Sequence, residues 1–320
     1  MNRQRILDTM LELCAIPSIS ETKGEIEAPL KMVKILERLS YFKTNPHHLQ
    51  LHTMPNDPLN RTYITAFMEG AVPSNKTVIL LSHYDVVGID EFGMLKKYAF
   101  HPILYTEHLK TTKSIELPQE ALKDLNSGDY LFGRGIMDMK YGIAAHIEVL
   151  YEIEKNLDTF QGNILLLSVP DEETNSAGML SAVEFLLSLK QEKNLEYLCA
   201  IISEPHFPKY PGDDNIYIYN GTVGKLLPVF YCVGKETHVG EPFAGINPNM
   251  LTGKLLERIH QNPHLSDTLG EIYTPAPTCL KQSDTKKDYS VQTPVAAYTY
   301  FNFVTLTSTP VVSSLTLFFY

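Results

Sequence analysis

Apolar runs of strand length that end in acids or a histidine recur along this chain. Residues 80–87 read Leu-Leu-Ser-His-Tyr-Asp-Val-Val, residues 169–173 read Val-Pro-Asp-Glu-Glu, and residues 201–205 read Ile-Ile-Ser-Glu-Pro. Continuous apolar runs are typical of strands in a sheet covered on both faces, and such sheets bind ligands at the carboxyl ends of their strands. The recurrence therefore predicts an α/β fold with a polar site at one edge of its sheet.

Helical patterns alternate with these runs. We predict helices at 3–15, 28–39, 141–153 and 178–189, and strands at 62–68, 77–81, 163–169 and 197–203. The last three strands are expected to be buried. Alternation of this kind implies an α/β sheet with helices on both faces. The stretch 90–129 is polar in part and is interpreted as an insertion beside the site.

The character of the chain changes after residue 214. We expect strands at 216–220, 223–233 and 296–307 and a helix at 248–261, which form a smaller α+β unit. A length of 320 residues suits two domains. The predicted division is 1–213 for the first domain and 214–308 for the second, with 205–214 as the hinge. Residues 309–320 are expected to form an exposed apolar tail.

Charge and cysteine content limit the functional classes. A formal net charge of −10 argues against a nucleic-acid partner, because phosphate contacts require clustered Lys and Arg. The four cysteines form no closely spaced pair and are expected to be free thiols in a reducing compartment. With neither an apolar leader nor a membrane span expected, the predicted location is the cytoplasm.

The polar residues at the strand ends have the composition of a metal site. Asp138 lies at a strand-to-helix turn within Gly-Arg-Gly-Ile-Met-Asp-Met-Lys-Tyr-Gly, residues 133–142. Two metal ions about 3.5–4 Å apart require a bridging carboxylate and separate ligands for each ion. We interpret Asp138 as the bridge, His83 as the nitrogen ligand, and Glu173 and Glu204 as the outer oxygen ligands.

Two further acids fit supporting roles. Asp85 lies two residues after His83 and is suited to accept the other imidazole N–H, which fixes the tautomer. Glu172, beside Glu173, is suited to take a proton from a water bound to metal. Each residue also has a structural explanation when taken singly: a core histidine, a solvated Glu-Glu pair, or a helix cap at Asp138. Four strand-end placements in one chain favour the site.

These motifs, in this order, resemble the co-catalytic zinc hydrolases of the aminoacylase, ArgE/DapE and carboxypeptidase-G type, which belong to metallopeptidase clan MH. The opening Leu-Cys-Ala-Ile-Pro-Ser-Ile-Ser, residues 13–20, adds to the resemblance, which is strongest to the RocB-type arginine-utilisation branch. The resemblance implies a zinc-peptidase-like mixed sheet plus a smaller lid and dimerisation domain. It also implies two zinc ions, with cobalt or manganese as alternatives, and hydrolysis of an amide or peptide bond in a small acyl-amino-acid or dipeptide-like substrate.

The resemblance also assigns individual metal ligands. His83, Asp138 and Glu204 would hold one metal, and Asp138 with Glu173 would hold the other. The family's bridging aspartate often precedes a cis peptide bond, which implies a cis bond between Asp138 and Met139.

The remaining assignments concern proton transfer and the homodimer. Glu172 would be the general base and Asp85 the residue that orients the imidazole. His238 would reach the active site of the partner subunit in a homodimer and stabilise the oxyanion.

The sequence departs from the family pattern at its end. Family members return from the lid to the first domain and supply a late histidine ligand, but the last histidine here is His264. We therefore expect a truncated chain with an exposed sheet edge and an incomplete second metal site. The missing ligand leaves open an inactive family member that keeps partial metal binding or lid-mediated dimerisation. A separate alternative is an acidic α/β binding protein without enzymatic activity.

Overall fold

The structure, a computed structural model, describes residues 1–306 except 209, 211 and 214. The chain divides into two compact units, Met1–Asp214 and Asn215–Tyr320. The apolar tail expected at 309–320 lies outside the described residues.

The first unit is built on a mixed five-stranded sheet. Its strands are β1 (Leu49–Thr53), β2 (Thr62–Glu69), β3 (Val72–His83), β4 (Gln161–Val169) and β5 (Glu196–Ile202), arranged in the order β1-β2-β4-β3-β5. β3 is parallel to both β4 and β5, whereas β1 and β2 are antiparallel additions. The carboxyl ends of β3, β4 and β5 therefore lie at the same edge.

The pairing of β3 with β4 has one irregular and one regular part. The register shifts between Val72 and Thr77 and is then continuous from Thr77, opposite Asn163, to His83, opposite Val169. These two strands consequently end level with each other.

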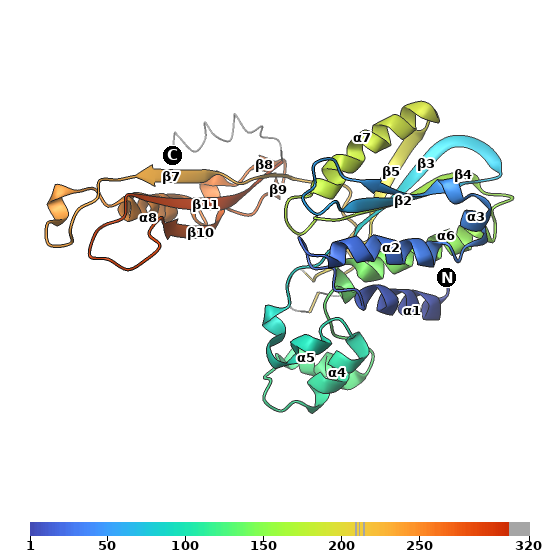
Figure 1. Ribbon diagram of the computed structural model, residues 1–320, viewed down its shortest axis with the longest axis horizontal. Helices are drawn as coiled ribbons and strands as arrows, with labels where there is room; N and C mark the ends of the chain where they lie inside the picture. The colour runs from blue at the N-terminus through green and yellow to red at the C-terminus, as the bar shows by residue number, and fades with distance from the viewer. Residues whose placement is uncertain (209, 211, 214, 307–320) are drawn as a thin grey trace. The chain divides into compact units, whose positions relative to one another are not determined.

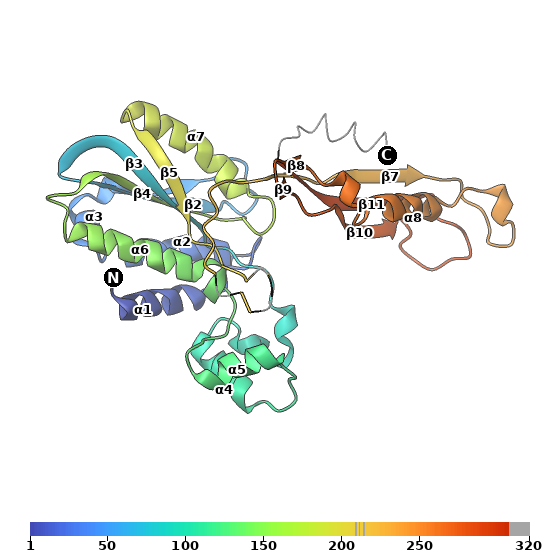
Figure 2. The same cartoon turned by 180° about the vertical axis from the view of Figure 1, so that it is seen from behind.

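Helices cover both faces of this sheet, which confirms the predicted fold class (Figures 1 and 2). One face carries α2 (Gly24–Leu36) and α6 (Tyr141–Glu154), with α1 (Arg3–Cys14) packed against α6, and the opposite face carries α7 (Ala177–Glu192). Alternate residues along β4 supply the two cores: Ile164 and Leu166 face α2 and α6, whereas Leu165 and Leu167 face α7. Two short helices, α3 (Ser40–Thr44) and η1 (Pro46–His48), precede β1.

The predicted insertion folds as a small helical group within the first unit. It contains η2 (Asp90–Tyr98), α4 (Pro102–Thr111) and α5 (Gln119–Ser127), which share a small core of Leu95, Leu109 and Leu125.

The expectation that residues 197–203 form a buried strand is wrong. β5 is the edge strand, and its apolar side chains are open to solvent; Leu198 and Ile202 are each 52% exposed. An apolar run does not distinguish a central strand from an edge strand, because its residues lack a polar face in either position.

The second unit is an antiparallel sheet with one main helix. Its central strand β11 (Ala296–Thr305) pairs with β10 (Thr278–Asp284) on one side and with β6 (Gly224–Leu226) and β7 (Val229–Val233) on the other. Helix α8 (Pro248–Ile259) packs on this sheet, and β8 (Thr268–Leu269) with β9 (Ile272–Tyr273) forms a separate hairpin. Two short helical turns, η4 (Pro242–Ala244) and η5 (Pro263–Leu265), lie in the loops on either side of α8.

Two strand predictions in the second unit are corrected. Residues 216–220 are not a strand, and the strand expected at 223–233 divides into β6 and β7 at Pro228. Proline has no N–H to donate to a neighbouring strand, so it interrupts the ladder there. No helix among the described residues is long and apolar enough to cross a membrane.

Candidate metal centre

His83 is the last residue of β3, at the carboxyl edge of the sheet. Its side chain is 2% exposed, and its backbone N–H points to the sulfur of Met139 at 3.2 Å. The imidazole Nδ1 lies 3.0 Å from the backbone oxygen of Asp85. A carbonyl oxygen only accepts, so Nδ1 carries a proton and Nε2 is the nitrogen directed at the site.

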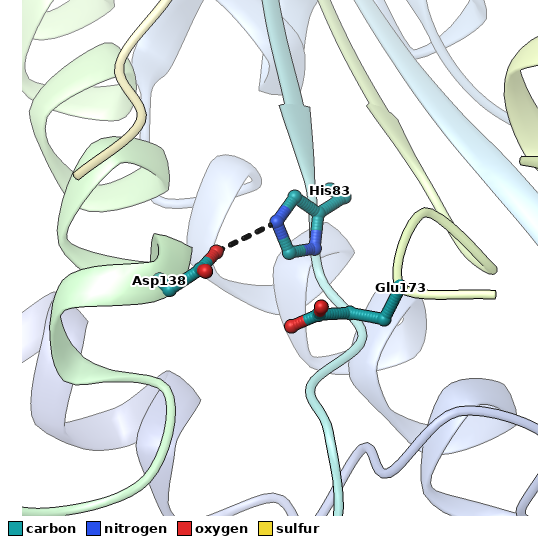
Figure 3. A group of neighbouring side chains, drawn as sticks. All are labelled: His83, Asp138 and Glu173. Atoms are coloured by element: carbon teal, nitrogen blue, oxygen red, sulfur yellow. Dashed lines mark hydrogen bonds and ion pairs between the residues drawn. The ribbon is translucent and has the colours of Figure 1, made fainter. Parts of the chain in front are cut away.

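Asp138 and Glu173 converge on His83 from two other segments. Asp138 comes from η3 (Ile136–Lys140), a short turn that leads into α6 and whose backbone is not helical at Asp138, and its Oδ1 lies 3.0 Å from His83 Nε2. Glu173 comes from the loop after β4. Figure 3 shows the three side chains pointing toward one another, and one ligand atom from each lies within 4.8 Å of the others. The Asp138–Met139 peptide bond is cis, as the resemblance implied.

Asp85, which was predicted to orient the His83 imidazole, also binds the loop that carries Glu172 and Glu173. Its buried carboxylate accepts hydrogen bonds from the backbone N–H groups of Glu172 at 3.1 Å and Glu173 at 3.2 Å, and from Ser20 Oγ at 2.8 Å. The distance from Asp85 Oδ1 to His83 Nδ1 is 3.4 Å. Burial disfavours the charged form, but hydrogen bonds with His83 and Ser20 hold the pKa of Asp85 below its ordinary value. Asp85 therefore anchors the loop that carries both glutamates as well as contacting the imidazole.

Glu172 and Glu204 lie on the open side of the cluster. Glu172 Oε2 is 3.9 Å and Glu204 Oε1 is 3.6 Å from His83 Nε2, and their side chains are 50% and 40% exposed. The residue before Glu204, Ser203, shares a hydrogen bond of 2.8 Å with His146 Nε2 of α6. The start of α6 therefore approaches the segment that carries Glu204.

A close backbone approach at Gly142 brings α6 to Ser203. A Cβ atom on Gly142 would lie 2.3 Å from the Ser203 backbone oxygen, so only glycine permits this spacing.

The electrostatics of the cluster suit a divalent cation. Burial raises the pKa of Glu204, with a further contribution from Asp138, to about 7, and the same causes raise the pKa of Glu173. Burial lowers the pKa of His83, but hydrogen bonds with Asp138 and Asp85 outweigh it and raise this pKa to about 10. Several carboxylates thus crowd around one imidazole. One nitrogen and several oxygen donors at this spacing are a ligand set that zinc accepts.

His238 lies in the second unit, in an exposed loop. Its Nδ1 accepts a hydrogen bond from the Gly240 N–H at 3.0 Å, and its backbone forms a bridge with Gln292. Its role toward a partner subunit stays a prediction.

Residues outside the predicted site also contact it or its supporting loop. Ser20 Oγ donates to Asp85, and Ser20 is the last residue of the opening motif, residues 13–20, so a sequence pattern does mark it. Arg61 binds Asp171, the residue before Glu172, but no local sequence pattern marks this arginine.

A mixed α/β sheet whose carboxyl edge gathers an imidazole and several carboxylates has the fold and the ligand types expected of a metal-dependent hydrolase. Residues 115–313 match the family described as Peptidase family M20/M25/M40, and the chain belongs to this family. The family predicted from the sequence is confirmed.

The relatives agree with this assignment. Protein RocB of Bacillus subtilis (strain 168) is 40% identical over 300 residues, which cover 93% of this chain and 52% of RocB. The chain therefore spans about half the length of that relative, and the predicted RocB-type resemblance is confirmed.

Two solved structures share the fold. The M20 family metallo-carboxypeptidase Sso-CP2 from Sulfolobus solfataricus has a TM-score of 0.62 at 16% identity, covering 99% of this chain and 74% of that chain. The di-peptidase Dug1p from Saccharomyces cerevisiae has a TM-score of 0.63 at 13% identity, covering 98% of this chain and 72% of that chain.

Proposed function

We propose that this chain carries the catalytic centre of a zinc-dependent amidohydrolase or peptidase. The observation that carries the proposal is the convergence of His83, Asp138 and Glu173, whose ligand atoms lie within 4.8 Å of one another at the carboxyl edge of the sheet. The M20 membership of the chain supports it. In this proposal the substrate is a small acyl-amino-acid or dipeptide-like molecule.

His83, Asp138 and Glu204 would hold one zinc ion, and Asp138 with Glu173 would hold the second; cobalt and manganese are alternatives. Bound metal ions lower the pKa of an attacking water and polarise the scissile carbonyl. Glu172, whose half-exposed carboxylate lies 3.9 Å from His83 Nε2, would be the base that accepts a proton from the attacking water and donates it to the leaving amine nitrogen.

Asp85 keeps these groups in place. Its backbone oxygen accepts the His83 Nδ1–H, and its carboxylate accepts two backbone N–H groups of the loop that carries the base and one ligand.

Substrate class and assembly follow from the resemblance. The likeness to the RocB-type branch supports a place in arginine or other amino-acid catabolism, and the two proteins of similar fold are a metallo-carboxypeptidase and a di-peptidase. A homodimer through the second unit would bring His238 to the active site of the partner subunit. The four free cysteines agree with a reducing, cytoplasmic location.

Metal analysis and hydrolysis assays test the proposal. Purified protein should bind about two zinc ions per chain and hydrolyse at least one member of a panel of N-acyl amino acids and dipeptides. Glu172→Gln should lower kcat at least ~100-fold while metal content is unchanged, because it removes the base and leaves the ligands. Glu37→Gln changes an exposed glutamate beyond the end of α2 and is the matched control.

Two results would count against the proposal. Hydrolysis that survives both His83→Ala and Asp138→Ala refutes the metal site. One metal ion or none, together with no turnover on the panel, favours the alternative of a family member that keeps only partial metal binding or dimerisation.

A further inference from the structure

Arg61 is a buried arginine surrounded by three buried acids. It precedes β2, and its side chain is 6% exposed. Its Nη1 donates to Glu25 Oε2 at 2.9 Å and to Asp171 Oδ1 at 2.8 Å, while Nη2 donates to Asp57 Oδ1 at 2.7 Å. The side chains of Glu25, Asp57 and Asp171 are 0%, 3% and 1% exposed. A buried charge is tolerated only when it is paired and hydrogen-bonded, as it is here.

Asp171 is the connection between this arginine and the candidate metal centre. Its backbone has a φ of 69°, and its N–H donates to Glu25 Oε1 at 3.0 Å. Its Oδ1 also accepts from Thr174 Oγ1 at 2.8 Å, its Oδ2 accepts from the Ala177 N–H at 3.0 Å, and its backbone oxygen accepts from the Ser176 N–H at 2.6 Å. Asp171 therefore fixes the whole turn, and the two residues after it are the two glutamates of the site.

The loop is thus held from two sides. On the inner side Asp85 accepts the N–H groups of Glu172 and Glu173. On the outer side Arg61 and Glu25 hold Asp171. Both anchors act on neighbouring peptide units, so a loss at either one should let the glutamates move relative to His83.

We propose that Arg61 is a positioning residue: through Asp171 and Glu25 it fixes the 171–177 loop so that Glu172 and Glu173 face His83 and Asp138. Its catalytic consequence rests on the function proposed above. The planar guanidinium is required, because one nitrogen binds two carboxylates while the rest of the fork binds Asp57. An ammonium group keeps the charge but does not reproduce this fork.

Hydrogen exchange tests the positioning without metal or substrate. In Arg61→Lys, amide exchange in the peptide that spans 171–177 should accelerate at least ~10-fold, because local opening becomes easier. Asp171→Asn, which is isosteric and leaves Arg61 paired with Glu25, should act in the same direction. Arg38→Lys is the matched control, since Arg38 makes two hydrogen bonds of 2.7 Å to Glu12 and none to the loop.

Cobalt binding and kinetics separate positioning from general stability. Folded Arg61→Lys should bind the second cobalt ion at least ~10-fold more weakly, with a changed visible spectrum. Its kcat should fall ~10–100-fold with KM within ~3-fold of wild type, as expected when reacting groups are misplaced by about 1 Å. If Arg61 only neutralised charge, the variant Arg61→Lys would match wild type in amide exchange, cobalt affinity and kcat. That result would overturn the proposal.

The two proposals can fail separately. If wild-type protein hydrolyses nothing but the exchange and cobalt results hold, the proposed function fails and the positioning of Glu172 and Glu173 stands. If wild-type protein is active and folded Arg61→Lys and Asp171→Asn match it in exchange, cobalt affinity and kcat, the positioning proposal is refuted.

Discussion

Replacement of Asp85 by asparagine should loosen the candidate site and destabilise the first unit. The asparagine side chain can place its oxygen where Ser20 Oγ and the Glu173 N–H donate. Its NH2 group then replaces the oxygen that accepts from the Glu172 N–H, so two donors face each other. A buried donor left without an acceptor costs ~1–3 kcal/mol, and each remaining bond loses ~1 kcal/mol when its acceptor becomes neutral. Removal of a buried charge offsets part of this loss. The expected decrease in the free energy of unfolding is ~2–4 kcal/mol.

Pulse proteolysis in urea, performed on metal-free protein, measures this decrease. Mass spectrometry of the fragments assigns the transition to the first unit, which is necessary because a protein of two units need not unfold in one step. Ser20→Ala removes one of the donors to Asp85 and should cost only ~1 kcal/mol. A variant Asp85→Asn that stays within ~0.5 kcal/mol of wild type, with unchanged amide protection at Glu172 and Glu173, would refute the reasoning.

Three other predictions follow from packing and charge. Gly142→Ala should lower the free energy of unfolding by ~1–3 kcal/mol and weaken metal binding, because its Cβ would lie 2.3 Å from the Ser203 backbone oxygen. Calorimetry measures the first effect and metal titration the second. Leu166→Ala should lower the free energy of unfolding, measured in urea, by ~2–5 kcal/mol, because Leu166 is fully buried. Hydrogen bonds from Arg38 hold the pKa of Glu12 at about 2, below its unfolded value, so the folded state favours the carboxylate. The Glu12 carboxylate should therefore add ~1 kcal/mol, after solvent screening, to the free energy of unfolding. This stabilisation should be complete above about pH 4.5 and should disappear as the pH falls toward 2. Urea unfolding at several pH values measures it, and it should be missing in Glu12→Gln.

The parts of the fold that the sequence predicted are those with strong local patterns. β2, β3 and β4 are found where apolar runs indicated them, and α6 and α7 are found where helical spacing indicated them. β1 was not predicted, because Leu49–Thr53 is only five residues long and Leu49 and Leu51 are its only apolar residues. The edge position of β5 was also missed, since it depends on which strands pair rather than on the composition of β5 itself.

The candidate site divides in the same way. His83, Asp138 and Glu173 were marked by their place after strands or at a turn, and the structure brings their ligand atoms together. The Arg61–Asp171 pair joins residues 110 positions apart in the sequence. Asp171 belongs to the Val-Pro-Asp-Glu-Glu motif, but no sequence pattern marks Arg61, so only the folded chain shows that they meet.

The register of β3 against β4 has a consequence for evolution. Side chains alternate between the two faces of a strand, so one residue inserted between Thr77 and His83 would turn the imidazole away from the site and exchange the residues that face α6 and α7. Between Val72 and Thr77 the register already shifts, and an inserted residue there enlarges an existing irregularity. Insertions and deletions among relatives should therefore occur in 72–76 and be rare in 77–83.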